Sequence, residues 1–132
     1  MQRSLSVLLP VKNAQATLNT AVHEILDEVA DSSDRFELLI IDDGSTDATS
    51  EVAHELTRDY PQIRLVRHGR PRGRDAAIRS GLERSKGEVV MLRNDESGFS
   101  LLERPTRIPN IVSSRPARPN YLSRLKNFAL GE

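Results

Sequence analysis

A buried strand that ends in a cluster of acids is the strongest structural signal in this chain, at residues 36–47 (FELLIIDDGSTD). Its first six residues form a nearly continuous apolar run, which is typical of a strand covered on both faces. Two carboxylates, a glycine, two hydroxyls and a third carboxylate follow. We expect the strand to end at Ile41, and Ser45, Thr46 or Asp47 to cap a helix by accepting a hydrogen bond from its first amides.

The acids at the end of this strand also indicate a candidate ligand site. In open α/β sheets, ligands bind where the strands reach their carboxyl ends. Carboxylates placed there can accept hydrogen bonds from a nucleotide base or ribose. Taken alone, the same residues are more typical of a well-capped strand-to-helix turn, so the interpretation depends on the rest of the chain.

Strands and helices alternate along the first 92 residues. Apolar runs predict the strands, and apolar residues at helical spacing predict the helices. We expect strands at residues 5–11, 36–41, 63–66 and 88–92, and helices at residues 17–30, 47–60 and between a basic loop at 68–74 and Gly87, which ends the helix. The inward-facing residues are expected to be Ala48, Val52, Leu56 and Tyr60 in the second helix and Ala77, Ile78, Gly81 and Leu82 in the third. This alternation is typical of an α/β domain with a mainly parallel sheet and helices on both faces.

The last third of the chain carries weaker patterns. A short helix is expected within residues 97–107. Residues 121–131 have apolar side chains at helical spacing, which is typical of a helix that packs on its own sheet or, alternatively, touches a membrane or a partner. We therefore expect one domain over residues 1–115 and a C-terminal tail with a short amphipathic helix over residues 116–132.

Four segments carry a resemblance to a known family. They are residues 6–14 (SVLLPVKNA), 41–47 (IDDGSTD), 72–82 (RGRDAAIRSGL) and 87–96 (GEVVMLRNDE). In this order they resemble the family 2 glycosyltransferases, and the third resembles the dolichyl-phosphate sugar synthase branch. The resemblance implies the nucleotide-sugar-binding half of a GT-A fold, which is Rossmann-like. It also implies a short strand at residues 111–115, after the fourth segment, and it leaves most of the acceptor half without a counterpart.

The resemblance also implies the residues of a site for a nucleotide diphosphate sugar, with UDP- or GDP-sugars as donors. Asp43 would contact the base, the Pro10–Val11 backbone and Asp42 would line the pocket, and arginines would face the phosphates. The candidate nucleotide-binding residues at matched positions are Pro10, Val11, Asn13, Asp42, Asp43, Gly44, Arg72, Arg74 and Arg79, and Arg93 is added because its guanidinium pairs well with phosphate oxygens. No catalytic base is identified.

The chain departs from the family at its metal-binding motif. Asp95 and Glu96 would hold Mg²⁺ or Mn²⁺ on the diphosphate, because such ions take carboxylate oxygens together with substrate phosphates. Arg93 stands where the family has the first acid of this motif. Its guanidinium would repel the metal and attract the diphosphate, so it either takes over part of the ion's task or marks a site that is no longer used. Lys12 also departs from the family, which usually has an aromatic residue there.

Composition excludes several other classes of function. The chain has 132 residues and no cysteine, so disulfides and thiolate chemistry are absent. Its three histidines have no zinc-site spacing, and no Ser-His-Asp arrangement is evident. Aromatic residues make up 4%, which weakens the case for nucleic-acid binding. No signal peptide or membrane-spanning run is visible, so we expect a cytoplasmic protein, with peripheral membrane contact as an option.

Two functions therefore stay open. The first is a glycosyltransferase that moves a sugar from the nucleotide diphosphate to an acceptor, such as a lipid phosphate or a polysaccharide. The alternative is a catalytically silent module that binds a nucleotide sugar or docks onto a protein partner. Residues 1–59 hold 12 acidic and 4 basic side chains and residues 60–132 hold 7 and 15, a polarity that also suits head-to-tail homo-oligomers.

Overall fold

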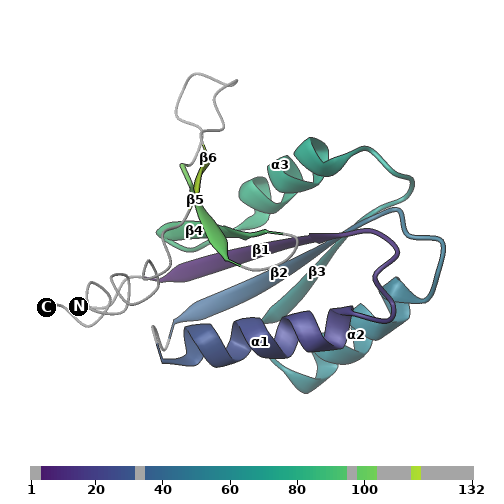
Figure 1. The fold of residues 1–132 in the computed structure, drawn as a ribbon, viewed down its shortest axis with the longest axis horizontal. Coiled ribbons are helices and arrows are strands. Elements are labelled where there is room, and N and C mark those ends of the chain that lie inside the picture. The colour runs from purple at the N-terminus through teal and green to yellow at the C-terminus, as the bar shows by residue number, and fades with distance from the viewer. Residues whose placement is uncertain (1–3, 32–34, 95–97, 104–113, 117–132) are drawn as a thin grey trace, which may run out of the picture.

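The computed structural model describes residues 4–31, 35–94, 98–103 and 114–116, which form one six-stranded sheet with helices on both faces (Figure 1). The strands lie in the order β3-β2-β1-β4-β5-β6. Their bounds are β1 Leu5–Val11, β2 Phe36–Asp43, β3 Ile63–His68, β4 Val89–Arg93, β5 Phe99–Leu102 and β6 Ser114–Pro116. The first four strands run parallel, whereas β5 is antiparallel to β4 and β6 to β5. The predicted α/β class and mainly parallel sheet are confirmed.

Two hydrophobic cores lie on opposite faces of this sheet. The helices are α1 Leu18–Ala30, α2 Thr49–Asp59 and α3 Arg74–Arg84, and Figure 1 shows α1 and α2 on one face and α3 on the other. Alternate residues of β2 serve the two faces: Leu38 and Ile40 belong to the α1–α2 core, and Leu39 and Ile41 to the α3 core. This is why the strand reads as continuously apolar. No helix in the described part of the chain is long and apolar enough to cross a membrane.

Strand β2 is longer than predicted. It continues through Asp42 and Asp43, because both residues have parallel partners: Asp42 pairs with Val11 of β1, and Asp43 pairs with His68 of β3. The expectation that the strand ends at Ile41 is therefore wrong. The consequence is that both acids are held by sheet hydrogen bonds, with the side chains fully or almost fully buried.

Gly87 does not end α3, as the sequence suggested. The helix ends at Arg84, and Ser85 follows as its cap, with the backbone N–H bonded to the carbonyls of Gly81 and Leu82. Gly87 is needed for a different reason. A Cβ atom on it would lie 2.6 Å from the backbone nitrogen and the Oγ atom of Ser6, so only a glycine allows this loop to pack against β1.

The inward face of α2 differs from the prediction in part. Leu56 is buried as expected, but Thr49, Ser50 and Ala53 are the other buried residues. Val52 packs only partly buried against the core. The inward stripe is therefore rotated around the helix relative to the prediction, toward Thr49, whose hydroxyl accepts the N–H of Ala14 in the β1–α1 loop.

The predicted helix within residues 97–107 is wrong where the structure describes it. Residues Phe99–Leu102 form β5, antiparallel to β4, with Leu101 opposite Met91. The open edge of β4 offers backbone hydrogen bonds that a four-residue segment cannot make on its own. The strand expected at residues 111–115 overlaps β6, whereas the helix at 121–131 and nearly all of the predicted tail lie outside the described residues.

Candidate functional site at the carboxyl edge of the sheet

Two loops are bonded to one another at the carboxyl edge of the parallel strands. The loop after β1 donates two backbone N–H groups to hydroxyls that follow β2: Asn13 to Ser45 Oγ in the β2–α2 loop at 2.8 Å, and Ala14 to Thr49 Oγ1 at the start of α2 at 2.8 Å. Asn13 itself has φ 53°, in the left-handed region that asparagine tolerates. These contacts fix the path of the β1–α1 loop beside β2.

The same two loops also bond in the opposite direction. The side-chain oxygen of Asn13 accepts the N–H of Thr46 at 2.9 Å, and that of Gln15 accepts the N–H of Ala48 at 3.1 Å. Ser45 and Thr46 are therefore not helix caps, as predicted, but bind the neighbouring loop. Asp47 does accept the N–H of Thr49, in the first turn of α2, at 2.9 Å.

Asp43 is the most elaborately bonded acid at this edge. It is 6% exposed, and its Oδ1 accepts the N–H of Arg72 at 2.8 Å and lies 2.8 Å from His68 Nδ1. Its Oδ2 accepts the N–H of Gly73 at 2.9 Å. Burial favours the neutral acid, but the bonds from His68, Arg72 and Gly73 together outweigh it and lower the pKa of Asp43.

His68 links Asp43 to helix α3. With Nδ1 donating to the carboxylate, a neutral His68 accepts the Ser80 hydroxyl at Nε2, over 2.8 Å. The sequence revealed no such Ser-His-Asp arrangement and placed His68 in a loop, whereas it is the last residue of β3. Neither His68 nor Ser80 lines the cavities described below. We therefore interpret this chain of hydrogen bonds as one that orients Asp43.

Gly44 allows the loop before α3 to reach Asp43. It has φ +70°, and a Cβ atom on it would lie 2.4 Å from the backbone nitrogen of Pro71. Any side chain at this position would push residues 70–73 away, together with the two N–H groups that bond to Asp43. Gly44 is thus a structural requirement of the site.

Asp42 is buried on the other face of β2. It is 0% exposed, and its Oδ1 accepts the N–H of Ser45 at 3.0 Å. Its Oδ2 lies 3.9 Å from Arg67 Nε and has no hydrogen-bond partner among the described residues. Asp42 therefore holds the β2–α2 turn in place.

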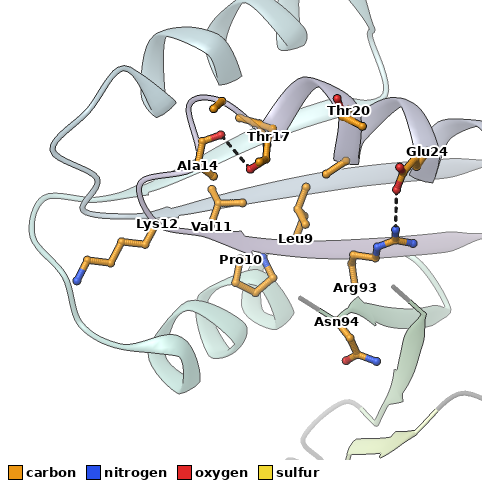
Figure 2. Close-up of a pocket in the computed structure, with 13 residues that line it drawn as sticks. Leu9, Pro10, Val11, Lys12, Ala14, Thr17, Thr20, Glu24, Arg93 and Asn94 are labelled. Carbon is orange, nitrogen blue, oxygen red and sulfur yellow. Dashed lines mark hydrogen bonds and ion pairs between the residues drawn. The ribbon is translucent and has the colours of Figure 1, made fainter. Parts of the chain in front are cut away.

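Two cavities open at this edge. The α3-side cavity, of about 450 Å³, is lined by Pro10, Val11, Lys12, Asp43, Pro71, Gly73, Arg74 and Ala77. The α1-side cavity, of about 430 Å³, is lined by Leu9, Pro10, Val11, Lys12, Ala14, Ala16, Thr17, Leu18, Thr20, Ala21, Glu24, Arg93 and Asn94 (Figure 2). Both volumes lie within the usual range of small-molecule sites.

Arg93 extends toward helix α1 rather than toward the α3-side cavity. Figure 2 shows its guanidinium beside Glu24, at 3.1 Å, and Glu28 lies at 3.5 Å. Its guanidinium carbon lies 5.0 Å from the centre of the Phe99 ring. The residue is 5% exposed, so it is held by two carboxylates and one aromatic face.

The structure brings together part of the predicted site. Pro10, Val11, Asp43 and Arg74 line the α3-side cavity. Arg72 approaches Asp43 through its backbone, and its side chain is exposed. Arg79 is exposed on α3 and lines neither cavity.

Three contributors to the site were missed: His68, Gly73 and Lys12. The parallel register between β2 and β3 places His68 opposite Asp43, and only this pairing could have revealed its role. Gly73 and Lys12 do appear in the motifs, but nothing in their spacing shows that they line a cavity.

The metal site stays a prediction. Asp95 and Glu96 lie outside the described residues, and residues 4–31, 35–94, 98–103 and 114–116 contain no group of three or more acids or histidines arranged to hold an ion. Arg93 is the described residue at which the acidic motif departs from the family. It carries a positive charge and faces α1.

Comparison with known proteins decides the family. The sequence model described as Glycosyl transferase family 2 matches residues 6–95. The chain belongs to this family. It is 29% identical over 115 residues to the dodecaprenyl-phosphate galacturonate synthase of Rhizobium johnstonii, covering 86% of this chain and 33% of that protein. It is 31% identical over 110 residues to a dolichyl-phosphate beta-glucosyltransferase of Trichomonas vaginalis, covering 76% and 34%.

Solved structures of GT-A glycosyltransferases share the fold. A mannosyltransferase from Pyrobaculum calidifontis, in complex with GDP-Man and Mn²⁺, superposes with a TM-score of 0.56 at 23% identity, covering 70% of this chain and 27% of that one. S. aureus TarS 1-349 in complex with UDP-GlcNAc gives 0.55 at 20% identity, covering 76% and 28%. This family 2 domain thus spans about a third of its relatives' length.

Proposed function

We propose that this family 2 domain binds a nucleotide diphosphate sugar, with the base in the α3-side cavity. The observation that carries the proposal is Asp43, an ionised and almost buried carboxylate in the wall of that cavity. Because the hydrogen bonds to Asp43 are already formed, ligand binding carries no free-energy cost for ordering this carboxylate.

Asp43 would accept a hydrogen bond from an N–H of the base. Its Oδ2 accepts one bond, from Gly73, so lone-pair capacity remains on that oxygen. The ring would lie against Pro10, Val11 and Ala77, which give the cavity its apolar wall. UDP and GDP both carry a ring N–H suited to a carboxylate acceptor, and they are the donors we propose.

Arginines of the β3–α3 loop would face the phosphates. Arg74 lines the cavity, Arg72 stands one residue before Gly73, and Arg79 lies farther along α3. Guanidinium groups pair well with phosphate oxygens. A role for Arg93 at the diphosphate would require its ion pairs with α1 to be exchanged for phosphate.

Asp95 and Glu96 are the residues we propose for Mg²⁺ or Mn²⁺. Such an ion would supply positive charge to the leaving nucleotide diphosphate. The presence of Mn²⁺ in the Pyrobaculum calidifontis mannosyltransferase complex supports this assignment.

A polyprenyl phosphate is the acceptor that the relatives suggest. The galacturonate synthase and the beta-glucosyltransferase are both named for lipid-linked phosphates. An acceptor of this kind would bring the domain into peripheral contact with a membrane. Since this chain spans about a third of those proteins, the transfer step would need further acceptor-side residues.

A binding module without turnover is the second candidate. It is favoured by Arg93, which occupies the first position of the metal motif and is neutralised by Glu24 and Glu28. Such a module would bind the nucleotide sugar and leave the sugar in place. Slow donor hydrolysis with Mn²⁺ would favour the enzyme, and saturable binding without hydrolysis would favour the module.

A thermal-shift screen tests the proposal directly. The purified chain is heated with UDP, GDP and their sugars, each with Mn²⁺ or with a chelator. Ligand at about 100 times its Kd adds roughly 2.7 kcal/mol to the free energy of unfolding, which moves the midpoint by several degrees. The Asp43→Asn variant should lose the shift. The absence of a shift with every nucleotide would contradict the proposed function.

A further inference from the structure

Lys12 stands where the two cavities meet. The α3-side and α1-side cavities share three lining residues, Pro10, Val11 and Lys12. A ligand that extends from the α3-side cavity toward the α1-side cavity therefore passes this shared rim. Of the three residues at the rim, Lys12 alone carries a charge.

The backbone of Lys12 is fixed on both sides. It follows Val11, the last residue of β1, which pairs with Asp42. It precedes Asn13, whose N–H and side chain both bond to the β2–α2 loop. The position of the Lys12 Cα atom is therefore set by the sheet and by the two bonded loops, and the side chain alone is free to move.

The Lys12 ammonium group is available to a ligand. The residue is exposed, and within the described part of the chain its side chain makes no hydrogen bond or ion pair. The neighbouring cation Arg93 is neutralised by Glu24 and Glu28. In Figure 2 the Lys12 side chain extends away from both Arg93 and Glu24, so these glutamates do not draw it inward.

We propose that Lys12 binds the diphosphate of the nucleotide sugar. The inference rests on the proposed function, since it takes the base to lie beside Asp43. The diphosphate is the next part of the ligand after the nucleoside, and it carries the negative charge. An ammonium group on a flexible stem pairs with phosphate as a point charge. Lys12, in the loop after β1, thus supplies a positive charge in addition to that of Arg74, which begins α3 and lines the same cavity.

The test compares a nucleoside with its diphosphate. Calorimetry measures the Kd of uridine, UDP, guanosine and GDP for the wild-type chain, for Lys12→Met and for Lys86→Met. The second variant is a matched control, because Lys86 is also exposed but lies in the loop after α3, at the opposite edge of the sheet, where only its backbone N–H bonds to Glu37.

Lys12→Met should weaken binding of the diphosphate about tenfold, the loss expected for one charge-assisted contact. Nucleoside affinity should change less than about twofold, and Lys86→Met should change neither. An equal loss for nucleoside and diphosphate, or no loss for the diphosphate, would overturn the role of Lys12 while leaving the proposed function intact. If the wild-type chain binds neither nucleosides nor diphosphates, the proposed function is overturned and this role with it.

Discussion

Two acids on the same face of β2 lie at opposite ends of the strand and serve different purposes. Glu37, at the amino end, accepts the Ser6 hydroxyl at 2.6 Å, the N–H of Lys86 at 2.6 Å and a guanidinium N–H of Arg64 at 2.7 Å. Asp43, at the carboxyl end, is bonded to His68 and to two backbone N–H groups. Both have a lowered pKa.

The difference lies in what surrounds each carboxylate. Glu37 is paired with the full positive charge of Arg64, and it lines neither of the two cavities described above. Asp43 is bonded to the His68 ring and to two backbone N–H groups, and it lines a cavity. An acid that is bonded but not paired with an arginine keeps its charge available to a ligand, which is why we assign binding to one end of the strand and structural support to the other.

The largest effect is expected from a side chain at Gly44. In Gly44→Ala, the Cβ atom would meet the backbone of Pro71 at 2.4 Å, at a residue with φ +70°. We expect a loss of about 3 kcal/mol in the free energy of unfolding, from steric overlap and from the strained backbone. Urea denaturation measures the loss. Nucleotide binding should also disappear, because residues 70–73 move away from Asp43.

Gly87→Ala should destabilise without affecting the ligand site. Its Cβ atom would lie 2.6 Å from backbone and side-chain atoms of Ser6, at a cost of about 2 kcal/mol. Nucleotide affinity should be unchanged at a temperature where the variant is folded. Gly69→Ala is the control, since nothing lies within 4 Å of its Cβ position. If Gly87→Ala weakened nucleotide binding as much as Gly44→Ala, the two ends of the strand would not be independent.

Replacing each carboxylate by an amide should affect ligand binding at the carboxyl end of β2 but not at its amino end. Asp43→Asn places an amide NH₂ against donors from His68, Arg72 or Gly73, and should cost about 2 kcal/mol, because hydrogen bonds to charged groups are the stronger ones. Nucleotide binding should be lost. Glu37→Gln should cost about 1 kcal/mol, since its side chain is partly exposed, and should leave nucleotide affinity intact. Chemical denaturation and calorimetry give the two quantities.

The two acids should also make stability depend on pH. For Glu37, burial raises the pKa, but the bonds from Ser6, Lys86 and Arg64 together lower it; for Asp43 the balance is the same. A lowered folded-state pKa gives stability that is complete above the unfolded-state value, about 4, and is lost as pH falls through the folded-state value. Unfolding free energy measured from pH 7 to pH 3 should therefore fall below about pH 5. If the free energy of unfolding fell just as steeply with pH in the double variant Glu37→Gln/Asp43→Asn, other titratable groups would be responsible for the pH dependence.

The smallest effect is expected at Arg93. Arg93→Met keeps an apolar contact with Phe99 but loses the ion pairs to Glu24 and Glu28, which are half exposed. Pairs of this kind contribute about 0.5 to 1 kcal/mol, and high salt should reduce the difference from wild type. Unchanged nucleotide affinity in the variant would support a purely structural role for Arg93 beside α1. A loss of affinity confined to the diphosphate would assign Arg93 to the phosphates.

Much of the fold follows from local patterns. Strand β1 occupies the predicted residues 5–11, and α1 begins one residue after its predicted start. The continuous apolar run of β2 indicated burial on both faces, and the structure places a helix layer on each. Such patterns are informative because strands bury every second residue on one face and helices every third to fourth, so apolar residues recur at these spacings in the sequence.

The site could be predicted only in part. The acids at the carboxyl end of β2 and the residues Pro10 and Val11 were found from motifs, and Asp43 does line a cavity with Pro10 and Val11. The bond from His68 to Asp43 depends on the register of β2 against β3, which no local pattern contains. Ser45 was expected to cap its own helix but binds the neighbouring loop, because a hydroxyl accepts equally well from either.

The sequence by itself determined the order of strands and helices, the acid-rich end of β2 and the membership of family 2. Tertiary structure decided that Phe99–Leu102 is a strand, that Arg93 turns to α1 and that Lys12 stands between two cavities. The physical reason is the range of the interactions. Periodicity and capping act between residues a few positions apart, whereas strand pairing, ion pairs and cavities form between residues that only the folded sheet brings together.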